Sequence, residues 1–256
     1  MSNNLLEIKK LTKSFGGLQA VNIENLTLNK NQLTSIIGPN GAGKTTFFDL
    51  ISGFQSSDSG QVILNGKVIT KLQPYQIARL GMIRTFQMTK VFDRMTVIEN
   101  LMFSASSVKN DSFFRGIIKL PSQKHYEKEL LEKSYELMEE LNIKHMADSY
   151  ARELSGGQKK LLELARSIIS NPSVLLLDEP LAGVNPKLAE DILNLIKKLS
   201  SNGISIVMVE HNIEAVMQIS ERIVVLAEGK TIADGNSQEI RNDQKVIEAY
   251  LGKDDE

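Results

Sequence analysis

Residues 33–46 read Leu-Thr-Ser-Ile-Ile-Gly-Pro-Asn-Gly-Ala-Gly-Lys-Thr-Thr, an apolar run that leads directly into a glycine-rich loop. The loop satisfies the pattern G-x-x-x-x-G-K-[ST] of a phosphate-binding P-loop. Leu33–Ile37 predicts a buried strand, and residues 45–52 predict a helix that ends at Gly53. Backbone N–H groups of such a loop, at the N-terminus of a helix, bind phosphate. This stretch therefore predicts a strand–loop–helix unit that holds a nucleotide.

The residue types in the loop fit a phosphate site. Gly38, Gly41 and Gly43 have no side chain, so the backbone can approach the phosphates closely. Lys44 is placed to reach the β- and γ-phosphates, and Thr45 offers its hydroxyl to Mg²⁺. The predicted nucleotide contacts are Gly38, Pro39, Asn40, Gly41, Ala42, Gly43, Lys44, Thr45 and Thr46.

The second half of the chain alternates short apolar runs with helical patterns. Residues 174–177, 204–209 and 223–226 predict buried strands, and residues 186–199 and 213–219 predict helices between them. Continuous apolar strands separated by helices are typical of a parallel sheet that is covered on both faces.

The first part of the chain has a different character. Residues 5–10 and 25–28 predict short strands, and Asn65-Gly66 between two apolar runs predicts a β-hairpin. These features favour a mixed, largely antiparallel layer beside the P-loop unit.

The middle of the chain is the most helical part. Residues 126–141 carry apolar side chains at helical spacing and predict a helix that packs one face on its neighbours. Residues 104–122 are less regular and predict a loop or short helix, with an exposed partner-binding loop as the alternative. We therefore expect one domain over residues 1–256, with a helical subdomain inserted at about residues 89–168.

Composition limits the classes of function. The 256 residues carry 30 basic and 31 acidic side chains, so the net charge of −1 gives no electrostatic reason to bind nucleic acid. The absence of cysteine excludes disulfides and thiolate metal sites. No apolar run approaches the roughly 20 residues that cross a bilayer, and the first residues do not resemble a signal peptide. We expect any membrane role to come through a partner.

Asp178 and Glu179 directly follow the apolar run at residues 174–177. Ligands of open α/β sheets bind beyond the carboxyl ends of the strands, so we expect both carboxylates beside the P-loop. Asp178 suits a Mg²⁺ role, and Glu179 could orient and deprotonate an attacking water. An Asp-Glu pair after a strand is often only a solvated turn, but the P-loop favours the catalytic interpretation.

A second glycine-rich stretch, Leu-Ser-Gly-Gly-Gln at residues 154–158, lies between the P-loop and Asp178. In this order the motifs resemble those of the ATP-binding cassette (ABC) ATPases over nearly the whole chain. The resemblance implies a RecA-like P-loop NTPase core, an α/β fold with an N-terminal antiparallel β subdomain and an inserted α-helical subdomain. It also implies that Ser155, Gly156, Gly157 and Gln158 contact ATP held on the P-loop of another subunit.

The resemblance assigns roles to three further residues. Gln87 matches a glutamine that approaches Mg²⁺ and the lytic water and leads toward the membrane partner. His211 matches a histidine that contacts the γ-phosphate and helps position the water, although a histidine after a strand is more often structural. Phe15 matches the aromatic ring that stacks on adenine, and its alternative is a core phenylalanine. His125 and His145 have no such context and are interpreted as surface or packing residues.

One position departs from the family pattern. The segment after Pro180 usually ends in Asp, whereas here residues 181–185 read Leu-Ala-Gly-Val-Asn. Asn185 keeps the hydrogen bonding and removes a charge, so coupling across the subunit interface is expected to be tuned differently.

Two stretches resemble the ATPase subunits of branched-chain, or hydrophobic, amino-acid importers. They are residues 81–101, which include Met-Thr-Val-Ile-Glu-Asn-Leu, and residues 242–252, Asn-Asp-Gln-Lys-Val-Ile-Glu-Ala-Tyr-Leu-Gly. ATPases of urea uptake and lipopolysaccharide export share parts of these patterns and remain alternatives. A non-transport ABC ATPase is disfavoured, because the chain has one cassette, no cysteine and no basic surplus.

The resemblance also implies cofactors, partners and location. We expect ATP and Mg²⁺, a homodimer or a pair with a paralogous ATPase subunit, and integral membrane permease subunits. An extracytoplasmic substrate-binding protein would be an indirect partner. The expected location is cytoplasmic, at the inner face of the membrane through the permease subunits.

Overall fold

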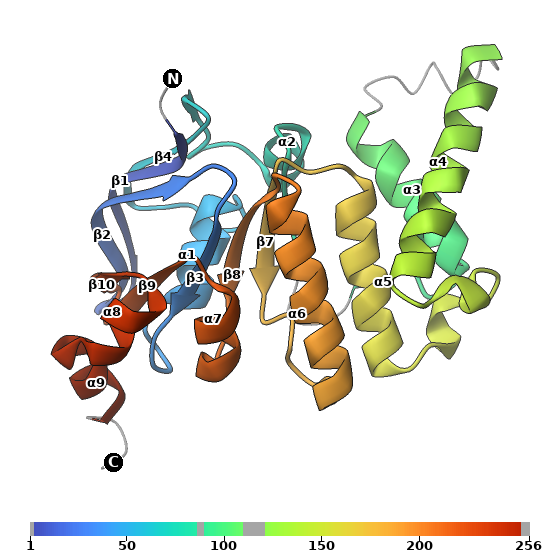
Figure 1. Cartoon of the computed structure of the whole chain (residues 1–256). Helices are drawn as coiled ribbons and strands as arrows, with labels where there is room; N and C mark the ends of the chain where they lie inside the picture. Colours follow the sequence, from blue (N-terminus) through green and yellow to red (C-terminus); the bar gives the residue numbers. More distant parts are fainter. Residues whose placement is uncertain (1–2, 86–89, 110–120, 252–256) are drawn as a thin grey trace. The chain divides into compact units, whose positions relative to one another are not determined.

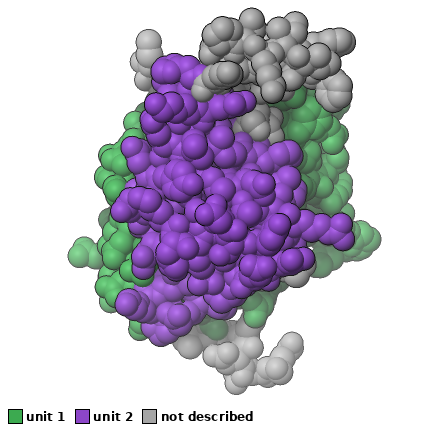
Figure 2. Space-filling model, turned by 90° about the vertical axis from the view of Figure 1, so that its right-hand side faces the viewer, with its two compact units in different colours: residues 1–84, 173–181, 190–256 green, residues 85–172, 182–189 purple. Residues whose placement is uncertain are grey.

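The computed structural model describes residues 3–85, 90–109 and 121–251 (Figure 1). The chain forms two compact units. Unit 1 comprises residues 1–84, 173–181 and 190–256, and unit 2 comprises residues 85–172 and 182–189 (Figure 2). Each unit is described separately below.

The first sheet of unit 1 is antiparallel, as the sequence predicts. Its strands are β1 (Asn4–Phe15), β2 (Leu18–Asn29), β4 (Ser59–Leu64) and β5 (Lys67–Val68), in the order β2-β1-β4-β5. The predicted hairpin joins β4 to β5 through Asn65 and Gly66, whose φ angles are +48° and +80°. Positive φ at both positions is the conformation that Asn-Gly favours in a two-residue hairpin loop.

The second sheet of unit 1 positions the motifs. Its strands are β3 (Leu33–Ile37), β6 (Met82–Arg84), β7 (Val174–Asp178), β8 (Ser205–Val209), β9 (Arg222–Ala227) and β10 (Lys230–Gly235), in the order β10-β9-β3-β8-β7-β6. The five strands from β9 to β6 are parallel, and β10 pairs antiparallel with β9. All residues of β3, β7 and β8 are buried, as continuous apolar strands require.

The helices of unit 1 follow these strands. They are α1 (Lys44–Ile51), α2 (Pro74–Arg79), α6 (Pro186–Ser201), α7 (Ile213–Ile219), α8 (Ser237–Asn242) and α9 (Gln244–Leu251), with the first four residues of α6 belonging to unit 2. Phe47 and Phe48 of α1 are fully buried in the core that also includes residues of both sheets. The core therefore fixes α1, and with it the start of the P-loop helix, against the sheet.

Unit 2 is helical. It contains α3 (Val97–Lys109), α4 (Pro121–Glu140) and α5 (Gly156–Ile169), together with two short 3₁₀ turns at Lys144–Met146 and Ala151–Glu153. The predicted helix at residues 126–141 is the greater part of α4, where Leu137 and Met138 are buried. The irregular segment 104–122 begins inside α3, and its residues 110–120 lie outside the described residues.

Short elements were harder to predict than the long ones. The sequence pattern indicates the strands and helices around the P-loop and Asp178, but not β6, β10, α2, α8 or α9, and it also misses the longer helix α3. Within residues 3–85, 90–109 and 121–251, no helix is long and apolar enough to cross a membrane.

Candidate nucleotide-binding site

The P-loop connects β3 to α1, and the surrounding backbone determines its shape. Gly38 has φ +154° and Gly43 has φ +93°, both unfavourable for residues with a side chain. A Cβ on Gly38 would lie 2.0 Å from the carbonyl oxygen of Leu226, and one on Gly43 would lie 2.2 Å from that of Ala20. Both positions therefore require glycine because the neighbouring strands approach so closely.

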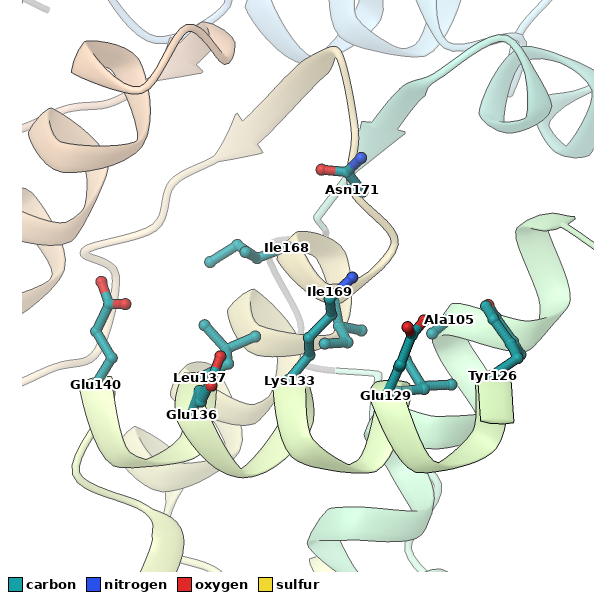
Figure 3. A pocket seen from close by; sticks show the side chains of 11 residues that line it. Ala105, Tyr126, Glu129, Lys133, Glu136, Leu137, Glu140, Ile168, Ile169 and Asn171 are labelled. Carbon is teal, nitrogen blue, oxygen red and sulfur yellow. The ribbon is translucent and has the colours of Figure 1, made fainter. Parts of the chain in front are cut away.

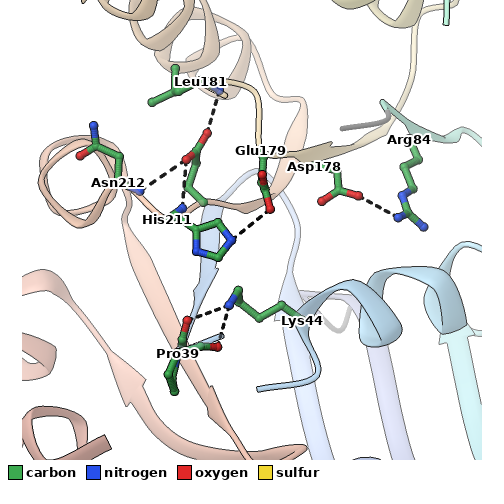
Figure 4. A network of polar contacts seen from close by, with 10 residues as sticks. Pro39, Lys44, Arg84, Asp178, Glu179, Leu181, His211 and Asn212 are labelled. Carbon is green, nitrogen blue, oxygen red and sulfur yellow. Dashed lines mark hydrogen bonds and ion pairs between the residues drawn. The ribbon is translucent and has the colours of Figure 1, made fainter. Parts of the chain in front are cut away.

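Lys44 is held inside this loop. The residue is 6% exposed, and its Nζ donates to the carbonyl oxygens of Gly38 at 2.7 Å and Pro39 at 3.0 Å (Figure 4). Lys44 begins α1, with Thr45 and Thr46 following in its first turn. A buried ammonium beside the N-terminus of a helix forms a positive environment that suits the phosphates of a nucleotide.

Asp178 ends β7 at the carboxyl edge of the parallel sheet. It is 4% exposed, and its Oδ2 accepts a hydrogen bond from Arg84 Nη2 at 2.8 Å. Arg84, at the end of β6, also donates from Nη1 to Asp49 Oδ1 of α1 at 2.7 Å. One guanidinium thus ties the Asp178 carboxylate to the P-loop helix, because the same side chain binds both carboxylates.

Glu179 and His211, both predicted to be catalytic, interact directly. His211 Nε2 lies 3.0 Å from Glu179 Oε1, a hydrogen bond in which the ring N–H donates to the carboxylate (Figure 4). The Glu179 side chain is 15% exposed and that of His211 is 47% exposed. Glu179 has φ +48°, a left-handed conformation that costs a non-glycine residue about 1–2 kcal/mol. This strained backbone holds the carboxylate beside the histidine.

The predicted Mg²⁺ ligands have suitable chemistry. Mg²⁺ is usually bound by one or two protein oxygens while phosphates and water supply the rest of the octahedron. Thr45 of α1 and Asp178 of β7 offer a hydroxyl and a carboxylate, and both belong to unit 1. The described residues contain no cluster of three or more His, Cys, Asp or Glu that would hold a metal without a nucleotide. This donor set fits a cation that arrives with the phosphates.

Two other predicted contacts have different outcomes. Phe15 ends β1 and is 50% exposed, with Lys13 Nζ 5.5 Å from its ring centroid, so the alternative of a core phenylalanine is wrong. Its exposed ring is available to stack on a base. Gln87 lies outside the described residues, and its catalytic and Mg²⁺ roles stay predictions.

The second glycine-rich stretch starts helix α5 of unit 2. Ser155 is the N-cap: its Oγ accepts from the N–H of Gln158 at 3.4 Å, and its own N–H donates to Gln158 Oε1 at 2.8 Å. These two reciprocal bonds form a capping box. Gly156 and Gly157 occupy the first turn, and a Cβ on Gly156 would meet nothing within 4 Å. The helix thus presents an open, positively polarised N-terminus.

Asn185, the residue that departs from the family pattern, caps the next helix. Its Oδ1 accepts a hydrogen bond from the N–H of Leu188 at 2.9 Å at the start of α6. Asn and Asp are about equally good N-caps, so the local fold does not need the charge.

Sequence reasoning missed three residues of unit 1 around the site. No motif in the sequence predicts a role for Arg84 or for Glu210. Tyr250 of α9 lies at the P-loop, where its hydroxyl accepts from the Gly38 N–H while burial raises the pKa of Tyr250 to about 12. A buried charge beside a motif residue was the available signal for Arg84 and Glu210, but burial cannot be read from a single position.

Comparison with known proteins agrees with this geometry. The model of the ABC transporter family matches residues 21–182, and a model described as branched-chain amino acid ATP-binding cassette transporter matches residues 230–256. The chain is 42% identical to the high-affinity branched-chain amino acid transport ATP-binding protein BraF of Pseudomonas aeruginosa, over 99% of this chain and 100% of that protein. It is 40% identical to LivG of Escherichia coli K12, which carries the same description, over 99% and 100% of the two chains.

Solved structures show the same fold. A nucleotide-free ATP-binding cassette from an ABC transporter matches with a TM-score of 0.82 and 35% identity, over 98% of this chain and 100% of that chain. An ATP-binding cassette in an ADP conformation matches with the same TM-score at 34% identity, over 98% and 100% of the two chains. The predicted ABC fold, with its N-terminal antiparallel sheet and mixed, largely parallel core sheet, is confirmed. The chain belongs to the ABC transporter family, and within it to the ATP-binding proteins of branched-chain amino acid transport.

Proposed function

We propose that this chain hydrolyses ATP with Mg²⁺ and so powers the import of branched-chain or other hydrophobic amino acids. The observation that carries the proposal is the Glu179–His211 pair at the carboxyl edge of the sheet that also bears the P-loop. A carboxylate held by a histidine beside a phosphate-binding loop can accept the proton of an attacking water. Mg²⁺, bound with the nucleotide, would neutralise charge on the β- and γ-phosphates.

The site residues of unit 1 have separate roles in this mechanism. Lys44 and the N-terminus of α1 bind the phosphates, and the exposed ring of Phe15 stacks on the adenine. Glu179 orients the water and takes its proton, while His211 holds the Glu179 carboxylate and contacts the γ-phosphate. Asp178 and Thr45 would hold the cation, with Arg84 fixing the orientation of Asp178.

The start of α5 acts on a nucleotide bound by a second ATPase subunit, identical or paralogous. Its glycines leave an open helix N-terminus that binds an anion, and Gly156 has no steric requirement inside its own chain. ATP would therefore be enclosed between the P-loop of one subunit and residues 154–158 of the other. Hydrolysis would reopen the pair.

Unit 2 supplies the contact with the membrane subunits, which place the chain at the cytoplasmic face of the membrane. A hollow of about 360 Å³ lies between α4, α5 and the end of α3 (Figure 3). Its apolar lining includes Leu137, Ile168 and Ile169. Three carboxylates of α4, from Glu129, Glu136 and Glu140, outnumber the ammonium of Lys133 in the same lining. This combination suits a permease helix with an apolar face and basic flanks. The substrate-binding protein outside the membrane would act only through the permease.

The variant Glu179→Gln tests the assignment of the base. It keeps the size of the side chain and removes the proton acceptor, so ATP binding should remain while turnover is lost. The ATP-bound pair of subunits should then accumulate on size-exclusion chromatography. Glu214→Gln, which removes an exposed charge from the first turn of α7, is the matched control and should turn over like the wild type. Wild-type turnover by Glu179→Gln would contradict the proposed base.

A further inference from the structure

Glu210 is a buried carboxylate directly before His211, at the end of β8. It is 4% exposed, and its two oxygens bind backbone groups of different segments. Oε1 accepts from the N–H of Leu181 at 2.7 Å, and Oε2 accepts from the N–H of His211 at 3.0 Å; Figure 4 marks these bonds as dashed lines from the labelled Leu181 and His211. Oε2 also lies 3.5 Å from the N–H of Asn212. A single side chain thus joins the segment after Glu179 to the segment that carries His211.

This connection lies next to the strained residue. The N–H of Glu179 donates to the carbonyl oxygen of Val209 at 2.9 Å, and Leu181, two residues further on, donates to Glu210. Hydrogen bonds to two consecutive residues, Val209 and Glu210, therefore hold the chain on both sides of the left-handed Glu179 backbone. Strained conformations persist only when the surrounding structure fixes them in this way.

We propose that Glu210 is a positioning residue for ATP hydrolysis, a carboxylate clamp that keeps the Glu179 backbone strained and the Glu179–His211 pair aligned. The inference rests on the proposed function, because it assumes that this pair acts on the attacking water. Glu210 does not touch the nucleotide in this scheme. It acts through the backbone N–H groups of Leu181 and His211.

The chemistry of the clamp requires a carboxylate of this length. Both oxygens accept, so glutamine at this position would direct its NH₂ group at one of the two N–H donors. Aspartate keeps both acceptors but shortens the side chain by one methylene. Burial raises the pKa of the Glu210 carboxyl, and its bonds to the N–H groups of Leu181, His211 and Asn212 act in the opposite direction. The backbone donors therefore offset only part of the cost of burying the charge, because the pKa of Glu210 remains raised.

The test compares Glu210→Gln with wild type, with Glu214→Gln as the matched control. We measure ATP affinity of the purified chain and the kcat of the chain assembled with its membrane subunits. Glu210→Gln should lower kcat at least about tenfold, because misalignment of the base acts on the transition state. ATP affinity should stay within about twofold of wild type, because the P-loop is untouched; a purely structural defect would lower both.

A double-mutant cycle with Glu179→Gln tests whether Glu210 affects hydrolysis through Glu179. If Glu210 acts through Glu179, adding Glu210→Gln to Glu179→Gln should not lower the residual single-turnover rate further. Additive losses, a wild-type kcat in Glu210→Gln, or an equal loss of ATP affinity would overturn the inference. If Glu210→Gln does not fold, Glu210→Asp should still lower kcat, by a smaller factor, while ATP affinity stays unchanged.

The same measurements distinguish a failure of the proposed function from a failure of the role of Glu210. A wild-type chain that binds ATP but shows no turnover in the assembled complex would refute hydrolysis itself, and with it the role of Glu210. A wild-type chain that hydrolyses ATP, beside a fully active Glu210→Gln variant, would refute the clamp alone.

Discussion

The two glycine-rich loops of this chain differ in what requires their glycines. In the P-loop, Gly38 and Gly43 have positive φ angles, and neighbouring carbonyl oxygens occupy the space where a Cβ would lie. In the second loop, a Cβ on Gly156 would meet nothing within 4 Å, and a Cβ on Gly157 would lie 2.7 Å from Cδ2 of Leu188, the end of a side chain and not backbone. The fold explains the first pair of glycines and not the second.

This difference indicates where the second loop acts. Glycine in a helix costs up to about 1 kcal/mol relative to alanine, so two glycines at the start of α5 weaken the helix without easing any backbone contact. We propose that the open space beside them serves a ligand bound by another subunit. A phosphate on a second subunit fits, because the N-terminus of a helix binds anions.

The largest expected effect concerns a P-loop glycine. Gly38→Ala places a Cβ at 2.0 Å from the Leu226 carbonyl oxygen, and the strand backbone there cannot easily move. We expect the free energy of unfolding to fall by about 3 kcal/mol from strain and overpacking together, measured by urea denaturation. A variant as stable as wild type would show that the fold does not fix this glycine.

At Gly156 the same substitution is expected to stabilise the fold. Gly156→Ala should raise the free energy of unfolding by up to about 1 kcal/mol, because alanine favours the helix and the space is open. The same variant should lose ATP turnover in the assembled complex, since the new methyl group occupies the anion site. Urea denaturation and phosphate release measure the two effects. A variant that gains stability and keeps wild-type ATP turnover would contradict the claim that Gly156 leaves space for an anion.

The positions of the two loops can be predicted from the sequence, but several residues that shape the site cannot. The P-loop and the strand before Asp178 are predictable because each lies in or next to a strongly patterned element, whereas the role of residues 154–158 is predicted from the family resemblance. The roles of Arg84 and Glu210 could not be predicted, because they depend on which backbone and side-chain groups from distant strands converge on them. The conformation of Glu179 was also hidden, since nothing in its residue type indicates a positive φ.

The smallest expected effect concerns the end of β1 that carries Phe15. Asp58 accepts from Lys13 Nζ at 2.9 Å and from the Ser14 N–H at 2.7 Å, and these bonds, led by that from Lys13, lower the pKa of the Asp58 carboxyl. The pKa of an aspartate in the unfolded chain is about 4. Because the folded-state pKa of Asp58 is lower, these bonds stabilise the fold at pH values above the unfolded pKa. This stability is lost as the pH falls through the folded-state pKa.

Asp58→Asn should therefore reduce stability slightly at neutral pH, and the gap from wild type should close as pH falls below about 4. The effect is small because the pair is exposed to solvent. Thermal unfolding of the two proteins between neutral and acidic pH measures the gap. A gap that widens toward acid would contradict the assigned pKa direction.

The most direct test of the shared site is the variant Ser155→Asp. Aspartate is as good an N-cap as serine, so α5 should keep its start, but a negative charge would face the phosphate of the other subunit. We expect ATP affinity of the isolated chain to equal that of wild type, while ATP turnover of the assembled transporter is lost. Unchanged turnover, or a loss of ATP affinity in the isolated chain, would contradict the claim that residues 154–158 act on a nucleotide bound by another subunit.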